Sequence, residues 1–148
     1  MAPLAENRKA YFDYDILEDY EAGIELLGTE VKSVRAGRVT MDGAYVTIRG
    51  GEAYILQMDI PPYQLANSPA DYDPLRMRRL ILTKKEIRDL ADTESGQGLT
   101  IVPLRVYNKG SKVKIAIGIA LGKKQFDKRE SIKTRETDRE IRRTLKNE

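Results

Sequence analysis

Positive charges surround one aromatic ring near the end of the chain. Lys123 and Lys124 precede Phe126, and Lys128 and Arg129 follow it after one acidic residue. Ammonium and guanidinium groups bind phosphates, and a phenyl ring offers a flat face on which a nucleobase can stack. Because no core-forming segment follows, the ring has no internal surface to pack against. These residue types at this spacing predict contact with nucleic acid.

The net positive charge is concentrated in the same region. Residues 122–148 hold ten Lys and Arg against six Asp and Glu, whereas residues 1–121 hold sixteen against seventeen. The chain's net charge of +3 at pH 7 therefore comes from its last 27 residues. A near-neutral body with a cationic tail is typical of proteins that bind a polyanion, most often nucleic acid. We expect a folded RNA-binding domain over residues 1–121 and a basic tail over residues 122–148.

One dense acidic group supports the rival prediction of an enzyme. It comprises Asp13, Asp15, Glu18, Asp19 and Glu21. On a strand, Asp13, Asp15 and Glu21 would face one way, which two-metal nuclease chemistry could use. The chain has no His and no Cys, which removes the commonest general base, the commonest zinc ligand and any thiolate. We therefore expect a binding protein that is not an enzyme and needs no cofactor or metal.

Length and composition indicate one soluble domain. The chain has 148 residues, of which 41% are hydrophobic and 33% charged. No apolar run approaches the ~20 residues of a membrane span, and residues 1–9 show no signal-peptide pattern. We expect a cytoplasmic monomer without membrane contact. A permanent ribosomal protein is a third alternative, although such proteins usually carry a larger positive excess.

Two hairpins are the clearest elements. Gly50-Gly51 joins a strand over residues 44–49 to one over 52–58, in a register that pairs Arg49 with Glu52. A second hairpin joins residues 99–106 to 113–120, where Val113, Ile115, Ile117 and Ile119 alternate and should face the core. The opposite face of the last strand is small and partly basic. Pro103 predicts a bulge or a sheet edge.

Shorter elements complete the expected fold. We expect a bent strand over residues 11–27, with the bend near Gly23, and another strand over 78–82. Helices are expected over residues 29–36, with Thr29 as N-cap, and from Thr83 to about residue 91. An irregular loop is expected over residues 61–77. About six strands without a βαβ repeat predict a mostly β protein, an OB-type antiparallel barrel with short flanking helices.

The tail is expected to be disordered when free. It has low hydrophobicity and dense mixed charge, although Thr137-x-x-Glu140 is a capping-box pattern. An isolated helix of this length is marginal in water. We therefore expect it to fold only on a partner.

Seven short segments are similar to the signatures of one family. They are Asn7-Arg-Lys-Ala10, Tyr20-Glu-Ala-Gly-Ile24, Gly28-Thr-Glu-Val-Lys-Ser-Val-Arg-Ala-Gly37, Gly51-Glu-Ala53, Asp73-Pro-Leu-Arg76, Gly122-Lys-Lys124 and Asp127-Lys-Arg129. In this order and spacing the set resembles the small protein B family, the SsrA (tmRNA)-binding proteins. The resemblance covers nearly the whole chain. It implies an OB-type barrel, an unstructured basic tail and a function in trans-translation, the rescue of ribosomes stalled on mRNA that lacks a stop codon.

The resemblance also implies the partners. The barrel would hold the tRNA-like domain of tmRNA. The tail would occupy the decoding centre of the small-subunit rRNA and the empty mRNA channel, and we expect it to be helical there. Elongation factor Tu with alanyl-tmRNA would be a further partner.

Residue roles follow from the same resemblance. For tmRNA binding it implies Glu21, Ile81 and Thr83, where the family more often has Leu and Asn or His at the last two positions. Further basic residues expected to contact tmRNA are Lys32, Arg35, Lys84, Lys123 and Lys124. Glu21, Ile81 and Thr83 each also have a structural alternative. Glu21 could be a solvated strand residue, Ile81 a core residue, and Thr83 a helix N-cap.

At the decoding centre the resemblance implies a stacking role for Phe126, where the family often has His or Tyr. Phe keeps the ring face and lacks the polar atom. The residues expected to accompany it on the ribosome are Asp127, Lys128, Arg129, Arg135, Arg139, Arg142 and Arg143.

Overall fold

The computed structural model describes residues 3–64, 69–96 and 98–123. Within these residues the chain forms one seven-stranded antiparallel sheet, in the spatial order β1-β6-β7-β2-β5-β4-β3. The strands are β1 (Ala5–Glu6), β2 (Tyr14–Ile24), β3 (Tyr45–Arg49), β4 (Glu52–Leu56), β5 (Arg78–Ile81), β6 (Leu99–Lys109) and β7 (Lys112–Gly122). The helices are α1 (Arg8–Asp13), α2 (Gly28–Arg35) and α3 (Lys84–Glu94).

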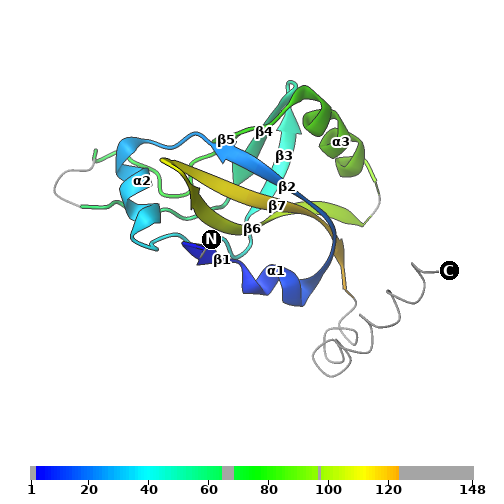
Figure 1. Cartoon of the computed structure of the whole chain (residues 1–148), viewed down its shortest axis with the longest axis horizontal. Helices are drawn as coiled ribbons and strands as arrows, with labels where there is room; N and C mark the ends of the chain where they lie inside the picture. Colours follow the sequence, from blue (N-terminus) through cyan, green and yellow to red (C-terminus); the bar gives the residue numbers. More distant parts are fainter. Residues whose placement is uncertain (1–2, 65–68, 97, 124–148) are drawn as a thin grey trace.

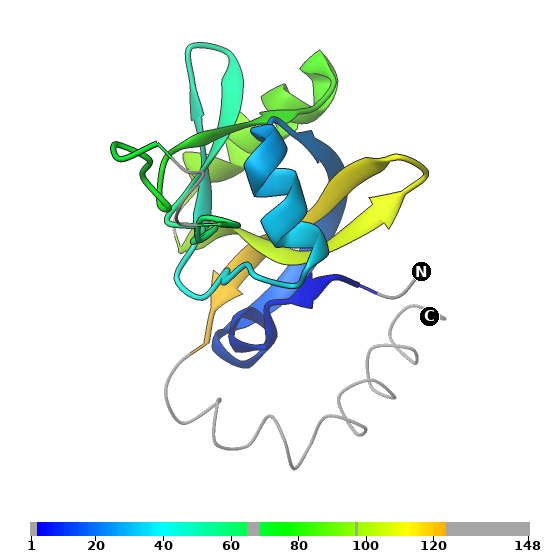
Figure 2. The same cartoon turned by 90° about the vertical axis from the view of Figure 1, so that its left-hand side faces the viewer.

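The sheet curls strongly on itself, as Figures 1 and 2 show. Its two ends approach each other where β3 lies against β6, so that the curled sheet encloses the main core. The expected mostly antiparallel β-barrel with short helices is confirmed. One strand more than expected is present among the described residues, because the two-residue β1 pairs with β6 through Ala5 and Val106.

Helix α1 occupies part of the segment that was expected to be a strand from residue 11. Asn7 caps this helix, because its Oδ1 accepts a hydrogen bond from the backbone N–H of Ala10 at 3.2 Å. The Asn7 Nδ2 donates to the Pro103 carbonyl of β6 at 2.8 Å. This contact with a distant strand stabilises a six-residue helix that would not persist alone.

Both hairpins have the predicted pairing. Arg49 faces Glu52 across the β3–β4 turn, where Gly50 and Gly51 have φ of 58° and 76°. Positive φ at both central residues is what a two-residue hairpin turn requires, and glycine adopts it without steric cost. In the second hairpin the pairing of β6 with β7 shifts between Pro103 and Arg105, which confirms the predicted bulge.

The starts of α2 and α3 differ in how well they were predicted. Thr83 caps α3 as expected, with its side chain accepting from the backbone N–H of Glu86 at 3.2 Å. Helix α2, however, has Leu27 and not Thr29 as its N-cap. The Glu30 carboxylate accepts from the backbone N–H of Leu27 at 2.8 Å, so a residue inside the helix satisfies this donor.

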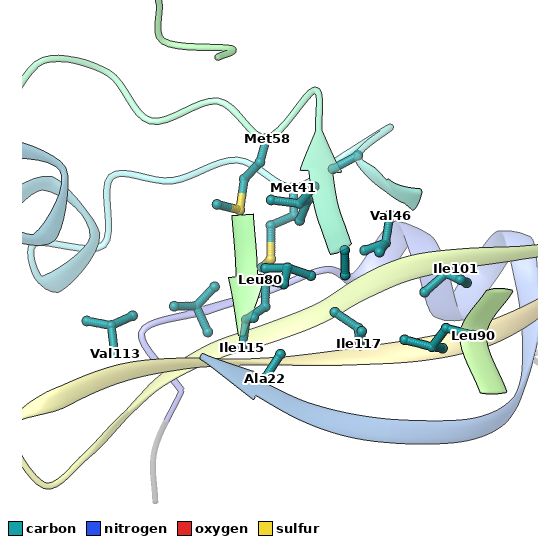
Figure 3. Close-up of a cluster of buried hydrophobic side chains, with 14 of the residues drawn as sticks. Ala22, Met41, Val46, Met58, Leu80, Leu90, Ile101, Val113, Ile115 and Ile117 are labelled. Carbon is teal, nitrogen blue, oxygen red and sulfur yellow. The ribbon is translucent and has the colours of Figure 1, made fainter. Parts of the chain in front are cut away.

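The main core fills the interior of the barrel. Ile115 and Ile117 of β7 are fully buried, and Figure 3 shows them pointing toward Met41 and Leu80. Val113 and Ile119 belong to the same cluster, which confirms the predicted alternation. A second, smaller cluster lies on the other face of the sheet beneath α1, and it includes Ala10, Leu104, Tyr107, Ala116 and Ala120.

No helix among the described residues is long and apolar enough to cross a membrane. Residues 124–148 lie outside the described residues. The expected disorder of the tail and its separation from the barrel as a unit therefore stay predictions.

Candidate nucleic-acid interface

The register of β2 places Glu21 on the outer face of the sheet. One extra residue, Leu17, interrupts the pairing of β2 with β7, and beyond it Glu21 pairs with Ala116 and Gly23 with Lys114. Paired residues of neighbouring strands share a face. Glu21 therefore lies on the same side as Lys114, opposite the face that carries Ile115 and Ile117 into the main core.

Ile81 joins Glu21 on this outer side, and Thr83 follows it at the start of α3. Ile81 of β5 pairs with Gly23, and its Cβ would come within 3.2 Å of any Cβ added there. Because Gly23 has no side chain, Ile81 can lie over β2 next to Glu21. Ile81 is 52% exposed, so the alternative that it belongs to the core is wrong. Thr83 follows two residues later, exposed at the start of α3.

The Glu21 carboxylate is bound within the protein at both oxygens. The Tyr107 hydroxyl donates to Oε2 at 2.5 Å, and the Lys109 ammonium donates to Oε1 at 2.9 Å. The hydrogen bond from Tyr107 and then that from Lys109 lower the pKa of Glu21 below its ordinary value. Burial, followed by the bond to Glu21, raises the pKa of Tyr107 to about 12. At neutral pH Glu21 is therefore a carboxylate and Tyr107 a neutral phenol.

A small recess opens beside this carboxylate. Its volume is about 160 Å³, and it is lined by Asp19, Tyr20, Glu21, Arg105, Tyr107 and Ala116. Arg105, Tyr107 and Lys109 alternate along β6 and so reach the outer face together. None of these three residues was predicted as a site residue from the sequence. Their alternation was visible in the sequence, but their position beside Glu21 depends on β7 lying between β6 and β2.

Lys32 and Arg35 lie exposed on α2, as expected for cations that bind RNA. The guanidinium of Arg35 donates to the Ser111 carbonyl at 2.7 Å, which joins α2 to the β6–β7 turn. The Lys32 ammonium and the Arg38 guanidinium lie 6.0 and 5.8 Å from the ring centroid of Tyr63. These contacts hold a second cationic surface next to the turn that follows Lys109.

Lys84 and Lys123 lie in different surroundings. Lys84 is exposed in the first turn of α3, directly after Thr83. The Lys123 side chain is only 12% exposed, and its ammonium donates to the Tyr11 carbonyl at 3.3 Å. Its backbone N–H also donates to the Asp13 carbonyl at 3.0 Å. Lys123 thus anchors the end of β7 to α1, whereas Lys114 and Glu21 lie near the other end of β7.

The remaining predicted site residues lie outside the described residues. They are Lys124, Phe126, Asp127, Lys128, Arg129, Arg135, Arg139, Arg142 and Arg143.

The prediction that Asp13, Asp15 and Glu21 face one way on a strand, as a two-metal site would require, is wrong. Asp13 is the last residue of α1 and so does not lie on a strand. Asp15 pairs with Leu121 and Glu21 with Ala116, and these alternate positions of β7 place the two carboxylates on opposite faces of the sheet. Residues 3–64, 69–96 and 98–123 contain no group of three or more His, Cys, Asp or Glu that could hold a metal ion.

A buried ion-pair network supports α2 and was not predicted. Arg78 is completely buried, and its Nε donates to Oε2 of Glu30 at 2.8 Å, while Arg76 donates to the same oxygen at 3.0 Å. The Tyr72 hydroxyl donates to the Ile60 carbonyl at 2.7 Å and lies 3.0 Å from Glu30. Burial alone would raise the pKa of Glu30, but hydrogen bonds from Arg76, Leu27 and Arg78 lower it to about 2. The network ties residues 72–78 to α2.

The fold and this surface define a class of protein: a small antiparallel β-barrel whose outer face carries cationic and aromatic side chains, as RNA-binding barrels do. The family profile described as SmpB protein matches residues 4–147. The chain belongs to the SmpB family.

Individual relatives agree with this assignment. An SsrA-binding protein of Ligilactobacillus salivarius is 52% identical over 144 residues, covering 97% of this chain and 92% of the relative. An SsrA-binding protein of Thermosynechococcus vestitus is 48% identical, with 97% and 94% covered. Among solved structures, a chain described as "tmRNA-SmpB: a journey to the center of the bacterial ribosome" is similar, with a TM-score of 0.70 and 45% identity. That match covers 88% of this chain and 95% of the other.

Proposed function

We propose that this protein binds tmRNA and brings it to stalled bacterial ribosomes for trans-translation. The observation that carries the proposal is the outer face of the barrel, where Glu21, Ile81 and Thr83 lie close together although about sixty residues separate the first from the other two. Relatives named SsrA-binding proteins and the tmRNA-SmpB structure support the same function. The protein acts by binding, without catalysis of its own and without a cofactor.

The barrel recognises the tRNA-like domain of tmRNA chiefly through its shape and backbone. Structured RNA is commonly bound through phosphates and 2′-hydroxyls, because side chains cannot read its deep, narrow major groove. Lys109 and Lys114 on the outer face, and Lys32 and Arg35 on α2, supply the cations for such contacts. Lys84 extends this surface beyond Thr83.

The tail acts on the ribosome. Phe126 stacks on a base of the decoding centre, and Lys128 and Arg129 pair with rRNA phosphates, while the later arginines follow the empty mRNA channel as a helix. The tail thereby replaces the missing pairing between codon and anticodon. The protein works as a cytoplasmic monomer, and elongation factor Tu carries the alanyl-tmRNA to which it is bound.

A pull-down of the full chain from bacterial lysate, with sizing and sequencing of the bound RNA, tests the proposal. The expected result is strong enrichment of tmRNA over tRNA and mRNA. Equal recovery of every ribosomal RNA, with the protein present on all ribosomes, would instead indicate a permanent ribosomal protein. Incubation of labelled tmRNA with the protein and Mg²⁺ should leave the RNA intact, whereas cleavage would indicate the nuclease alternative.

A further inference from the structure

The surroundings of Glu21 raise a question about how this acid serves an RNA-binding face. A carboxylate repels phosphate, and the RNA groups that could donate to it are base amines and the 2′-hydroxyl. In this structure both oxygens of Glu21 already accept a hydrogen bond from the protein, one from Tyr107 and one from Lys109. The charge of the carboxylate is therefore balanced at once by the ammonium beside it.

The two donors differ in exposure, and the hydrogen bond to Glu21 has a different effect on each. Tyr107 is only 9% exposed, and its ring forms a wall of the recess, so the bond to Glu21 holds that wall in place. The Lys109 side chain is 55% exposed and has three N–H donors, of which Glu21 takes one. The other two donors remain available beside Glu21, whose carboxylate lines the recess. A free lysine loses considerable side-chain entropy when it binds a phosphate, and a tethered one loses less.

Arg105 provides a second cation in the recess wall. Arg105 is half-buried, and its side chain makes no hydrogen bond or ion pair with any residue in the part of the chain that the structure describes. A guanidinium carries five N–H donors in a planar fork that matches the oxygens of a phosphate. Asp19 also lines the recess and can accept a hydrogen bond from a sugar hydroxyl. At about 160 Å³ the recess is smaller than the ~300–1,000 Å³ of sites that enclose whole ligands.

We propose that this recess takes one ribose–phosphate unit of the RNA backbone, that Arg105 and Lys109 bind its phosphate, and that Glu21 is a positioning residue which acts through Lys109 and Tyr107. The inference rests on the proposed function and explains why an acid belongs on this face. Glu21 holds the ammonium at the recess and fixes the tyrosine ring that shapes it. Its own contact with the RNA is not required.

Measuring the dissociation constant of full-length protein and tmRNA over a range of salt concentrations tests the roles of Glu21 and Lys109. Glu21→Gln and Lys109→Met should each weaken binding about tenfold, the effect of losing one charge-assisted contact. The losses in the double variant should fall well short of multiplying, because much of the effect of Glu21 passes through Lys109. Glu21→Gln should weaken binding even though it removes a negative charge from an RNA-binding surface.

Further variants separate contact with RNA from a purely structural effect. Arg105→Gln and Lys109→Met should each reduce the slope of log Kd against log salt concentration by about one, the signature of one lost phosphate contact. Lys109→Arg should retain most of the affinity and the slope. The control is Arg49→Gln, an exposed arginine beside the β3–β4 turn, which should change neither quantity. Tyr107→Phe removes only the hydroxyl and should weaken binding less than Lys109→Met does.

The outcomes distinguish this inference from the proposed function. If the unaltered protein does not bind tmRNA, both are wrong. If it binds but the losses in the double variant multiply to about a hundredfold, Glu21 contacts the RNA itself and the positioning role is wrong. Unchanged salt slopes for Arg105→Gln and Lys109→Met would contradict the phosphate site while leaving tmRNA binding intact. Thermal unfolding of each variant identifies any loss that comes from misfolding.

Discussion

Two of the glutamates in this barrel have similar partners and very different surroundings. Glu21 lies at the surface, where Lys109 and Tyr107 bind it and where solvent screens its charge. Glu30 is 1% exposed and shares its oxygens between Arg76 and Arg78, the second of which is fully buried. A change at Glu21 should therefore affect function more than folding. A change at Glu30 should affect folding first.

Glu30→Gln should destabilise the protein by about 3–5 kcal/mol at pH 7, because it leaves the buried Arg78 without its counter-charge. Urea-induced unfolding measures the change. Lys9→Met is a suitable control, since it removes one partner of an exposed ion pair with Asp13 and should cost less than about 1 kcal/mol. Equal losses for the two variants would contradict the structural role of the network.

The same carboxylate predicts a dependence of stability on acid. The pKa of Glu30 falls from 4.5 to about 2 on folding, so its contribution is fully present above its unfolded value. That contribution should be lost as pH falls from about 5 toward 2. The free energy of unfolding, followed over this range, should decline less in Glu30→Gln than in the unaltered protein. Parallel curves for the two proteins would show that Glu30 titrates normally.

At the residue scale the tail makes a separate prediction. Phe126→Ala should reduce peptide tagging of stalled chains about tenfold, because base–aromatic stacking contributes ~1–3 kcal/mol. Phe126→His and Phe126→Tyr keep a ring face and should change tagging little. Binding to isolated tmRNA should be unaffected in all three. Full tagging by Phe126→Ala would mean that the ring only anchors the tail where it leaves the barrel.

Among the elements, β7 packs against hydrophobic clusters on both faces of the sheet, which restricts the size of its side chains. Ile115 and Ile117 enter the main core, while Ala116, Gly118 and Ala120 lie under the second cluster beneath α1. The small residues on that second face are required by close packing. A Cβ at Gly118 would lie 2.9 Å from Ile16 Cγ2 and 3.0 Å from Leu104 Cδ1.

Gly118→Ala should therefore destabilise the protein by about 1–3 kcal/mol, the usual cost of overpacking. Gly122→Ala, at the end of the same strand, is the matched control because a Cβ there would meet nothing within 4 Å. Thermal unfolding compares the two. A Gly118→Ala protein as stable as the control would show that the side chains of Ile16 and Leu104 can move aside without cost.

For the whole molecule, the important relation is between the outer face and the exit of the tail. Glu21 pairs with Ala116 and Gly23 with Lys114, whereas Tyr14 pairs with Gly122 at the opposite end of the same two strands. The chain leaves that end through Lys123, which α1 holds. In the proposed function the barrel binds tmRNA through its outer face and the segment that follows Lys123 acts on the ribosome, so the two roles start from opposite ends of β2 and β7.

Removing residues 124–148 should therefore leave most of the tmRNA affinity and abolish tagging. The truncation is placed after Lys123 because β7 runs to Gly122 and the Lys123 backbone binds α1. Filter binding measures the affinity and a tagging assay the function. A loss of several orders of magnitude in affinity would show that the tail also captures tmRNA.

The features that the sequence determined by itself are those that short-range chemistry decides. Gly50-Gly51 selected a two-residue turn and with it the whole register of β3 and β4, and Thr83 with Glu86 set the start of α3. Strict alternation in residues 113–119 identified a core strand. The family resemblance indicated Glu21, Ile81 and Thr83, of which the pairing of β2 with β5 and β7 brings Glu21 and Ile81 to one face.

The tertiary structure decided what depends on partners far along the chain. Helix α1 exists because Asn7 bonds to β6 about a hundred residues away, and Leu17 reverses the facing of every later residue in β2. Glu30 is buried because Arg76 and Arg78, more than forty residues along the chain, bind its carboxylate. Glu21 and Tyr107, 86 residues apart, meet because β7 lies between their strands. Local preferences cannot specify such contacts, since they arise only when the closed sheet sets the distances between its strands.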